Sequence, residues 1–148
     1  MTATNPEQLH EAVASALTKH AKLKYTKNRR LVVDVLAAMD KPVTPPEITK
    51  AGKQLAASTV YRNLDLLADV GVVRKIAGEP YSFYELAEPL KPHHHHLICV
   101  DCGDIEDVEF GSAFEAQVDK GLTKAAKKAG FKPLHHTLDL QGLCKACA

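Results

Sequence analysis

The stretch HHHHLICVDCG, residues 93–103, places four imidazoles and two thiols within eleven residues. A second Cys-x-x-Cys pair, formed by Cys144 and Cys147, lies close to the C-terminal end of the sequence. Imidazole nitrogens and thiolate sulfurs are preferred ligands of zinc in proteins. Two residues between paired cysteines also let both sulfurs reach one ion. Metal binding is therefore the first hypothesis for this chain.

The four cysteines fit a closed tetrahedral zinc site that ties the chain end to the strand before residue 103. The alternatives are a redox-active dithiol or buried free thiols; paired Cys-x-x-Cys motifs in a reducing compartment favour metal ligands. Structural zinc contributes about 10–16 kcal/mol in small modules, so we expect a C-terminal domain of this size to unfold without it. The expected ligands are Cys99, Cys102, Cys144 and Cys147.

The net charge of +1 over 148 residues excludes a strongly polybasic or polyacidic protein, but the charges are unevenly distributed. Residues 19–75 contain twelve Lys or Arg and five Asp or Glu, whereas residues 101–119 contain seven acidic residues and no basic one. This pattern indicates an N-terminal half suited to polyanions and a C-terminal half suited to cations. No stretch is apolar enough for a membrane span or a secretory signal, which predicts a cytoplasmic protein.

The N-terminal half reads as helices followed by a hairpin. Asn5 with Pro6 starts a first helix, Thr26 a second, and the capping box Thr44-Pro45-Pro46-Glu47 a short third. Ser58 is the expected N-cap of a helix over residues 59–70, which ends at Gly71. Residues 72–76 and 81–86 are strand-like and joined by a Gly/Pro-containing turn. This order predicts a winged helix-turn-helix.

The C-terminal half is expected to be a small α/β domain. Strands are predicted near residues 96–99, 105–110 and 134–140, with a helix opened by Ser112 and closed by Gly130. The predicted fold class is α+β, a winged helix-turn-helix followed by an α/β dimerisation domain with the four-cysteine zinc site. The expected boundaries are residues 1–86 for DNA binding, 87–92 for a Pro-rich hinge and 93–148 for dimerisation and metal binding.

The histidine run is expected to form two sites, because successive side chains on a strand face opposite ways. His94 and His96 should then share one side, and His93 and His95 the other. The alternative is a run of solvated surface histidines. Residues that could complete the two sites are Glu85, Asp107, Glu109, Glu115, His135 and His136.

The start of the fourth helix carries side chains that suit contacts with phosphates and base edges. A capped surface helix would explain these residues equally well when they are taken alone. Together with the basic excess and the predicted wing, they favour binding of double-stranded DNA. The residues are Ser58, Thr59, Tyr61, Arg62 and Asn63.

Several motifs in order resemble the ferric uptake regulator family of bacterial regulators, over nearly the whole chain. They are STVYRNL at residues 58–64, YEL at 84–86, HHHHLICVDCG at 93–103, HTL at 136–138 and the final Cys-x-x-Cys. The resemblance implies a homodimeric, metal-dependent transcriptional repressor and not an enzyme. It also implies that the four cysteines hold structural Zn²⁺ and that Tyr61 reads bases.

The resemblance further implies two sites for a regulatory divalent metal. The site at the hinge would consist of Glu85, His94, His96 and Asp107. A second site, within the dimerisation domain, would consist of His93, His95, Glu115 and His136.

Lys41 and Ala87 depart from patterns within the family, and His95 departs from its iron-sensing members. Lys41 stands where many members supply a histidine to the hinge site, and Ala87 where the zinc-sensing branch often has a cysteine. His95 stands where iron-sensing members commonly have Asp, and imidazole-rich sites favour zinc or nickel over manganese.

We therefore expect a zinc-sensing repressor of metal-homeostasis genes. Members sensing iron, manganese, nickel or peroxide are the alternatives within the family. Outside it, the alternatives are a zinc-stabilised nucleic-acid-binding module without sensing, or a metallohydrolase. The metallohydrolase lacks any His-Glu-x-x-His motif to support it.

Overall fold

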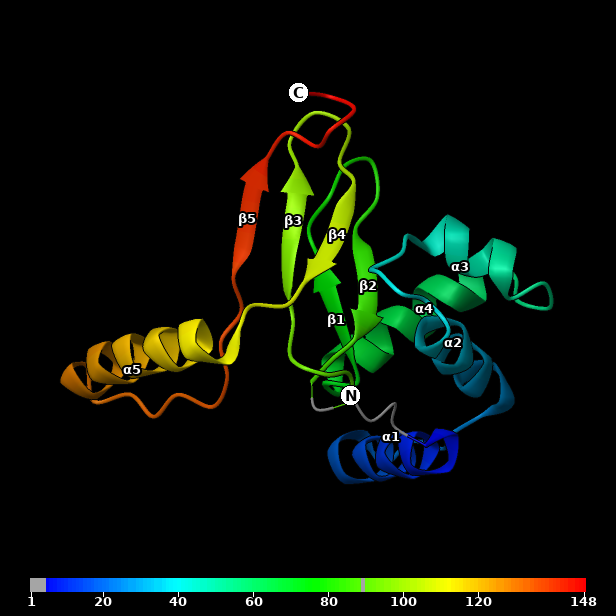
Figure 1. The fold of residues 1–148 in the computed structure, drawn as a ribbon. Helices are drawn as coiled ribbons and strands as arrows, with labels where there is room; N and C mark the ends of the chain where they lie inside the picture. Colours follow the sequence, from blue (N-terminus) through cyan, green and yellow to red (C-terminus); the bar gives the residue numbers. More distant parts are fainter. Residues whose placement is uncertain (1–4, 89) are drawn as a thin grey trace. The chain divides into compact units, whose positions relative to one another are not determined.

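A computed structural model describes residues 5–88 and 90–148 of the chain (Figure 1). The chain divides into two compact units, one comprising residues 1–93 and the other residues 94–148. Among the described residues, no helix combines the length and the apolar character needed to cross a membrane.

The N-terminal unit contains four helices and a two-stranded hairpin. The helices are α1 (Pro6–Ala21), α2 (Lys27–Ala37), α3 (Pro45–Ala51) and α4 (Ala57–Asp69), and the antiparallel strands are β1 (Val73–Ile76) and β2 (Phe83–Leu86). This is the winged helix-turn-helix order that the sequence predicts.

Local hydrogen bonds explain where the first three helices begin. The Asn5 side chain accepts a hydrogen bond from the Glu7 backbone N–H at 3.0 Å. In α3, the Glu47 carboxylate accepts one from the Thr44 backbone N–H at 2.7 Å. Thr26 caps α2, as predicted. These bonds satisfy backbone donors that have no partner within the helix.

The core of the N-terminal unit is aliphatic and well buried. Each helix contributes apolar residues at a helical spacing, and the hairpin closes one side of the cluster. Fully buried members include Val13, Leu17, Val32, Val33, Ile48, Val60, Leu64 and Leu67. This packing holds α4 with its other face exposed.

The C-terminal unit is built on a three-stranded sheet in the order β4-β3-β5, with β3 in the middle (Figure 1). Strand β3 (His95–Cys99) pairs antiparallel with β4 (Ile105–Val108) and parallel with β5 (Asp139–Gly142). The parallel pairing needs a crossover, and the long helix α5 (Ser112–Lys128) lies within it. The central position of β3 puts His95 and His96, the last two residues of the histidine run, between two other strands.

Several element boundaries differ from the predictions. The hairpin strands begin at Val73 and Phe83 rather than at residues 72 and 81, and β4 ends at Val108 rather than at residue 110. Helix α4 begins at Ala57, and its N-cap is Ala56 rather than Ser58. Helix α5 has Gly111 rather than Ser112 at its N-cap. The last strand begins at Asp139, which pairs with His96 of β3, and not at residue 134. Residues 133–136 instead lie beside α5, where they line a pocket.

Candidate metal centres

The four cysteines converge at one end of the three-stranded sheet. Cys99 ends β3 and Cys102 lies in the following turn, while Cys144 and Cys147 follow β5. The parallel pairing of β3 with β5 carries both knuckles to the same end, and the Val100 N–H donates to the Gly142 carbonyl at 2.9 Å. All four Sγ atoms lie within 4.8 Å of one another, and none of the four forms a disulfide.

The arrangement of the thiols fits zinc. Ligands about 2.3 Å from a tetrahedral ion lie about 3.8 Å from one another, and the Sγ atoms of Cys102 and Cys144 are 3.7 Å apart. Backbone N–H groups of Cys102, Cys144 and Asp101 lower the pKa of the Cys99 thiol to about 6. The fold thus already stabilises one thiolate here.

The pKa of Cys147 moves in the opposite direction. A hydrogen bond with Asp101, followed by those with Cys144 and Cys102, raises the pKa of this thiol. Crowded thiols resist ionising together unless a cation compensates their charge. The four-cysteine site predicted from the sequence is therefore present, and four thiols at this spacing suit a tetrahedrally coordinated divalent ion.

A first imidazole cluster lies at the start of β3 and on β4, with His94 directly before β3. His94 and His96 have their ring centroids 5.1 Å apart, and an oxygen of Asp107 lies 3.8 Å from Nε2 of His94. The other oxygen of Asp107 lies 3.9 Å from Nε2 of His96. Both imidazoles are buried, and His96 is wholly inaccessible to solvent. Two imidazoles and a carboxylate around one point form a donor set suited to a divalent transition metal.

The hydrogen bonding of His96 leaves the correct nitrogen facing this cluster. Nδ1 of His96 lies 3.0 Å from an oxygen of Asp139 on β5. An ionised carboxylate only accepts hydrogen bonds, so Nδ1 carries the proton and donates it. In the neutral ring Nε2 then has a lone pair, which is the form that binds metals.

A second cluster lies between β3, α5 and the segment before β5. Nε2 of His95 is 2.9 Å from one oxygen of Glu115, and Nε2 of His136 is 3.3 Å from the other. The rings of His95 and His136 stack with centroids 5.3 Å apart. His136 donates through Nδ1 to Asp119 at 3.0 Å. Two imidazoles thus share a single carboxylate.

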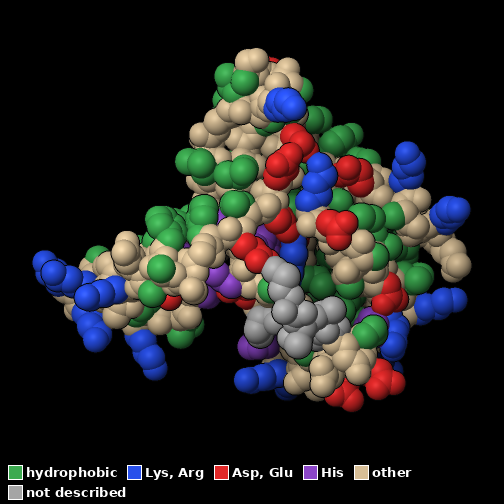
Figure 2. Space-filling model, viewed as in Figure 1, with side chains coloured by type: hydrophobic (Ala, Val, Ile, Leu, Met, Phe, Trp, Pro, Cys, Tyr) green, Lys and Arg blue, Asp and Glu red, His purple; other side chains and the backbone are tan. Residues whose placement is uncertain are grey.

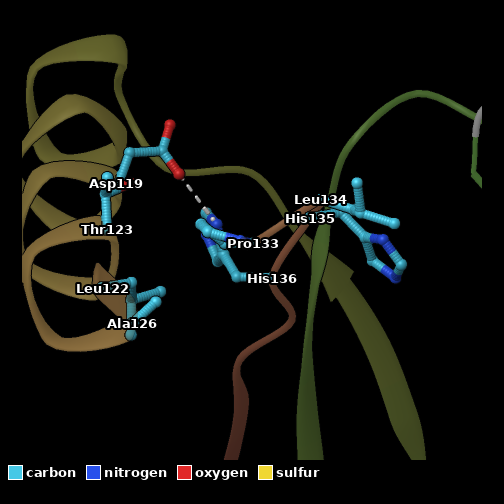
Figure 3. A pocket seen from close by; sticks show the side chains of 8 residues that line it. All are labelled: Asp119, Leu122, Thr123, Ala126, Pro133, Leu134, His135 and His136. Atoms are coloured by element: carbon cyan, nitrogen blue, oxygen red, sulfur yellow. Dashed lines mark ion pairs between the residues drawn. The ribbon is translucent and has the colours of Figure 1, made fainter. Parts of the chain in front are cut away.

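A pocket of about 310 Å³ opens beside this second cluster, between α5 and residues 133–136 (Figure 3). His136 points toward Asp119 on α5, whereas His135 points away from the helix (Figure 3). Leu122 and Ala126 form an apolar wall. The pocket gives the His136 side of the cluster contact with solvent, which distinguishes it from the enclosed cluster around His96.

His95 differs from His96 in where its proton lies. The backbone N–H of Leu138 donates to Nδ1 of His95 at 3.1 Å. The neutral ring therefore carries its proton on Nε2, which donates to Glu115. A metal bound there would have to replace this proton, so the second cluster is less prepared for an ion than the first.

Two of the predicted ligands belong to the N-terminal unit. Glu85 lies on β2 with its side chain buried, and its carboxylate oxygens are 3.1 Å from Nζ of Lys91 and 3.7 Å from the Arg74 guanidinium. His93 is exposed at the end of this unit, and its Nδ1 lies 2.6 Å from a carboxylate oxygen of Glu88. Glu85 is thus a buried carboxylate balanced by two basic groups.

His10 of α1 is buried, and both of its ring nitrogens contact neighbouring side chains. Nδ1 of His10 lies 2.7 Å from the Tyr25 hydroxyl, and Nε2 lies 2.9 Å from an oxygen of Asp34. Burial, followed by the Asp34 charge, raises the pKa of Tyr25, so the phenol stays protonated and its hydroxyl donates a hydrogen bond to Nδ1 of His10. This cluster joins α1 to α2 and explains why His10 is buried.

The start of α4 presents most of the predicted DNA-contacting residues. Ser58, Tyr61 and Arg62 are exposed and Thr59 is half-buried. Asn63 is buried, and its amide donates to the Thr59 carbonyl at 2.7 Å, so it packs within the unit and lies outside the exposed face. Basic side chains project from the helices of this unit (Figure 2).

Sequence reasoning missed two carboxylates, Asp119 and Asp139, that contact Nδ1 of the candidate ligands His136 and His96. Their spacing along the chain carries no signal, because each meets its histidine only through the crossover and the parallel pairing. Two other candidates, Glu109 and His135, are exposed and lie outside the clusters described here.

The profile of the ferric uptake regulator family matches residues 20–141. The ferric uptake regulation protein of Campylobacter jejuni is 36% identical over 132 residues, which cover 84% of this chain and 80% of that protein. The structure of the Helicobacter pylori ferric uptake regulator Fur, described as having three functional metal-binding sites, superposes with a TM-score of 0.75. It is 28% identical, over 99% of this chain and 97% of that one.

A zinc uptake regulator complexed with zinc and DNA is also similar, with a TM-score of 0.52 and 25% identity over 93% of both chains. The winged helix, the converging cysteines and these likenesses define a metal-responsive, DNA-binding transcriptional regulator. The chain belongs to the ferric uptake regulator family. Members of this family are transcriptional regulators, not enzymes.

Proposed function

We propose that this protein is a repressor of metal-homeostasis genes that binds its operator when a divalent metal, preferentially zinc, occupies the cluster of His94, His96 and Asp107. The observation that carries the proposal is the geometry of that cluster, with two buried imidazoles and a carboxylate around one point. Zinc is favoured because His95 makes the neighbouring cluster rich in nitrogen. An iron-responsive regulator is the alternative that the Campylobacter relative supports.

The two clusters need further ligands, and we propose the ones that the family resemblance implies. Glu85 would complete the set around His94, His96 and Asp107. His93 would complete the set around His95, Glu115 and His136. Glu85 is a buried carboxylate that a cation stabilises, and an ion bound there would compete with Lys91 and Arg74, which pair with it within the N-terminal unit.

We propose that residues 1–86 bind DNA, that 87–92 form the hinge, and that 93–148 form the dimerisation domain. Helix α5 buries none of its residues within its own chain, although it carries apolar side chains. Exposed apolar residues of this unit include Phe114, Leu122, Phe131, Leu134, Leu140 and Leu143. Apolar surface of this extent is typical of an interface, and a second copy of the chain would cover it.

Metal would act by selecting one arrangement of the two halves. An ion shifts such an equilibrium only by its difference in affinity for the two states. The complete ligand set, with Glu85 bound to the same ion as His94 and His96, would form in one of the two arrangements. In that arrangement, the α4 helices of a dimer would lie about 34 Å apart, which is one turn of DNA. The four-cysteine zinc would hold the sheet together throughout.

The test compares DNA binding with and without the regulatory metal. We expect one zinc per chain to survive mild chelation in native mass spectrometry, with one or two further ions lost and restored. Affinity for a duplex selected from a random-sequence pool should rise about 5–150-fold on reloading, the usual range of allosteric coupling. One ion throughout, with unchanged DNA affinity, would identify a zinc-stabilised module without sensing.

A second test addresses the DNA-binding face. We expect Tyr61→Ala to weaken binding to the selected duplex by about 1–3 kcal/mol and to relax the preference at one base position, because base contacts carry the specificity. Asp69→Ala, an exposed change on the same helix, is the control. Fluorescence anisotropy against single-base variants of the duplex would measure both effects. An unchanged base preference in Tyr61→Ala would remove this residue from the reading face.

A further inference from the structure

The parallel pairing of β3 with β5 brings Asp139 beside His96. In the register of the sheet, His96 faces Asp107 on β4 and Asp139 on β5. The two aspartates therefore flank one imidazole on the central strand. The backbone N–H of His96 also donates to the Leu138 carbonyl at 3.2 Å, which holds the chain in this register.

The two aspartates meet different nitrogens of the ring. Asp139 lies 3.0 Å from Nδ1 and accepts a hydrogen bond from it, whereas Asp107 lies 3.9 Å from Nε2 on the side of the metal cluster. Metal-binding histidines commonly donate their second nitrogen to a carboxylate, which fixes the ring orientation and makes the ligating nitrogen more basic. His136 and Asp119 repeat this arrangement in the second cluster.

We propose that Asp139 is a positioning residue that holds His96 with the Nε2 lone pair directed at the regulatory metal. The inference rests on the proposed function and adds to it a residue outside the ligand sets. Asp139 touches no metal. It acts by keeping the proton on Nδ1, so that the ring needs no rearrangement when an ion arrives.

The burial of His96 strengthens this role. The Asp139 side chain is 36% exposed and its histidine is wholly buried, whereas Asp119 is 66% exposed. A hydrogen bond shielded from water competes less with solvent. Loss of such a partner typically lowers metal affinity about 10–100-fold.

The experiment uses the full-length chain with its four-cysteine zinc retained, and cobalt(II) as the probe of the regulatory site. Cobalt affinity would be measured by optical titration against a competing chelator. Long-range proton–nitrogen NMR, before cobalt is added, would report which nitrogen of His96 carries the proton. The variants are Asp139→Ala, which removes the acceptor, and Asp139→Asn, which keeps a carbonyl acceptor. Glu106→Ala is the control. Glu106 precedes Asp107 on β4 and faces the other side of the sheet, so this change removes a charge from the same strand without touching the cluster.

We expect Asp139→Ala to lower cobalt affinity about 10–100-fold and to move part of the His96 population to the form protonated at Nε2. Asp139→Asn should keep the wild-type proton position and most of the affinity, and Glu106→Ala should match wild type. Circular dichroism would check the folding of each variant. If Asp139→Ala does not fold, the cobalt affinity and the His96 proton position are measured on Asp139→Asn.

Two results would overturn the proposal. One is a His96 proton position that is unchanged in Asp139→Ala together with unchanged affinity. The other is a loss in Asp139→Asn as large as in Asp139→Ala with the proton position intact, because Asp139 would then be a direct ligand. If wild type binds no cobalt at this cluster, the proposed function fails instead, and the NMR comparison still tests Asp139.

Discussion

Replacing both Cys144 and Cys147 with serine is expected to unfold the C-terminal unit while the N-terminal unit stays folded. The reason is the small core of residues 94–148, all of which the structure describes. Within that unit, the buried apolar side chains are those of Cys99 and Ile105, and α5 buries none. Structural zinc contributes about 10–16 kcal/mol in small modules, against about 5–15 kcal/mol for the stability of an entire domain. Little would remain to stabilise the sheet without the ion.

Hydrogen exchange monitored by mass spectrometry on the full chain separates the two units. Peptides spanning β3 and β5 should lose protection in the double variant, whereas peptides of α2 and α4 should exchange as in wild type. Lys145→Ser is the matched control, because it alters the same knuckle at an exposed residue between the two cysteines. Retained protection of β3 in the double variant, with no zinc bound, would show that the sheet is stable by itself.

The sequence predicted the features that depend on local order. Helix starts at Asn5, Thr26 and Thr44 follow from side chains that reach the first turn of the same helix. The alternation of the histidine run follows from the period of two in a strand, and the structure places His96 with Asp107 and His95 with Glu115. The convergence of two Cys-x-x-Cys knuckles follows from zinc chemistry alone.

The features that depend on long-range pairing could not be predicted. The register of β3 with β5 aligns Asp139 with His96. A shift of this register by one residue would turn Asp139 to the other face of the sheet, and nothing in the local sequence fixes the register. Asp119 meets His136 only because the segment after α5 turns back along the helix. The amide side chain of Asn63 is of a type that contacts DNA, but its position on α4 turns it toward the core, where it is buried.

The metal-ligand motifs could be predicted from the sequence, whereas the residues that orient those ligands could not, and the two groups differ in function. Metal ligands recur in short motifs because one strand or one turn must present several donors to a single ion. Residues that orient those ligands come from whichever element lies next to them, so their identity depends on topology and not on spacing. The sequence therefore reveals the donor set, while the structure reveals how protons are distributed among the histidines.

The double replacement His94→Ala and His96→Ala is expected to abolish the metal dependence of DNA binding. Both imidazoles of the first cluster are lost, and the remaining carboxylates, Asp107 and the proposed ligand Glu85, form a far weaker site for a transition metal than a set with two imidazoles. The four cysteines are untouched, so the variant should retain one zinc per chain. In wild type, coupling of about 1–3 kcal/mol should raise DNA affinity roughly 5–150-fold when metal is added. In the double variant, added metal should leave DNA affinity unchanged.

The measurement is a titration of the selected duplex with and without added zinc, read by fluorescence anisotropy. Its control removes two imidazoles elsewhere, in His20→Ala with His135→Ala, both exposed residues outside the clusters. The control should keep the wild-type rise, which excludes a general effect of losing histidines. If the His94 and His96 variant still responds to zinc as wild type does, the regulatory ion must act at the second cluster, and the proposed mechanism is wrong. If it binds DNA tightly without any metal, the two imidazoles instead hold the protein in its inactive arrangement, because their loss then has the effect assigned to the ion.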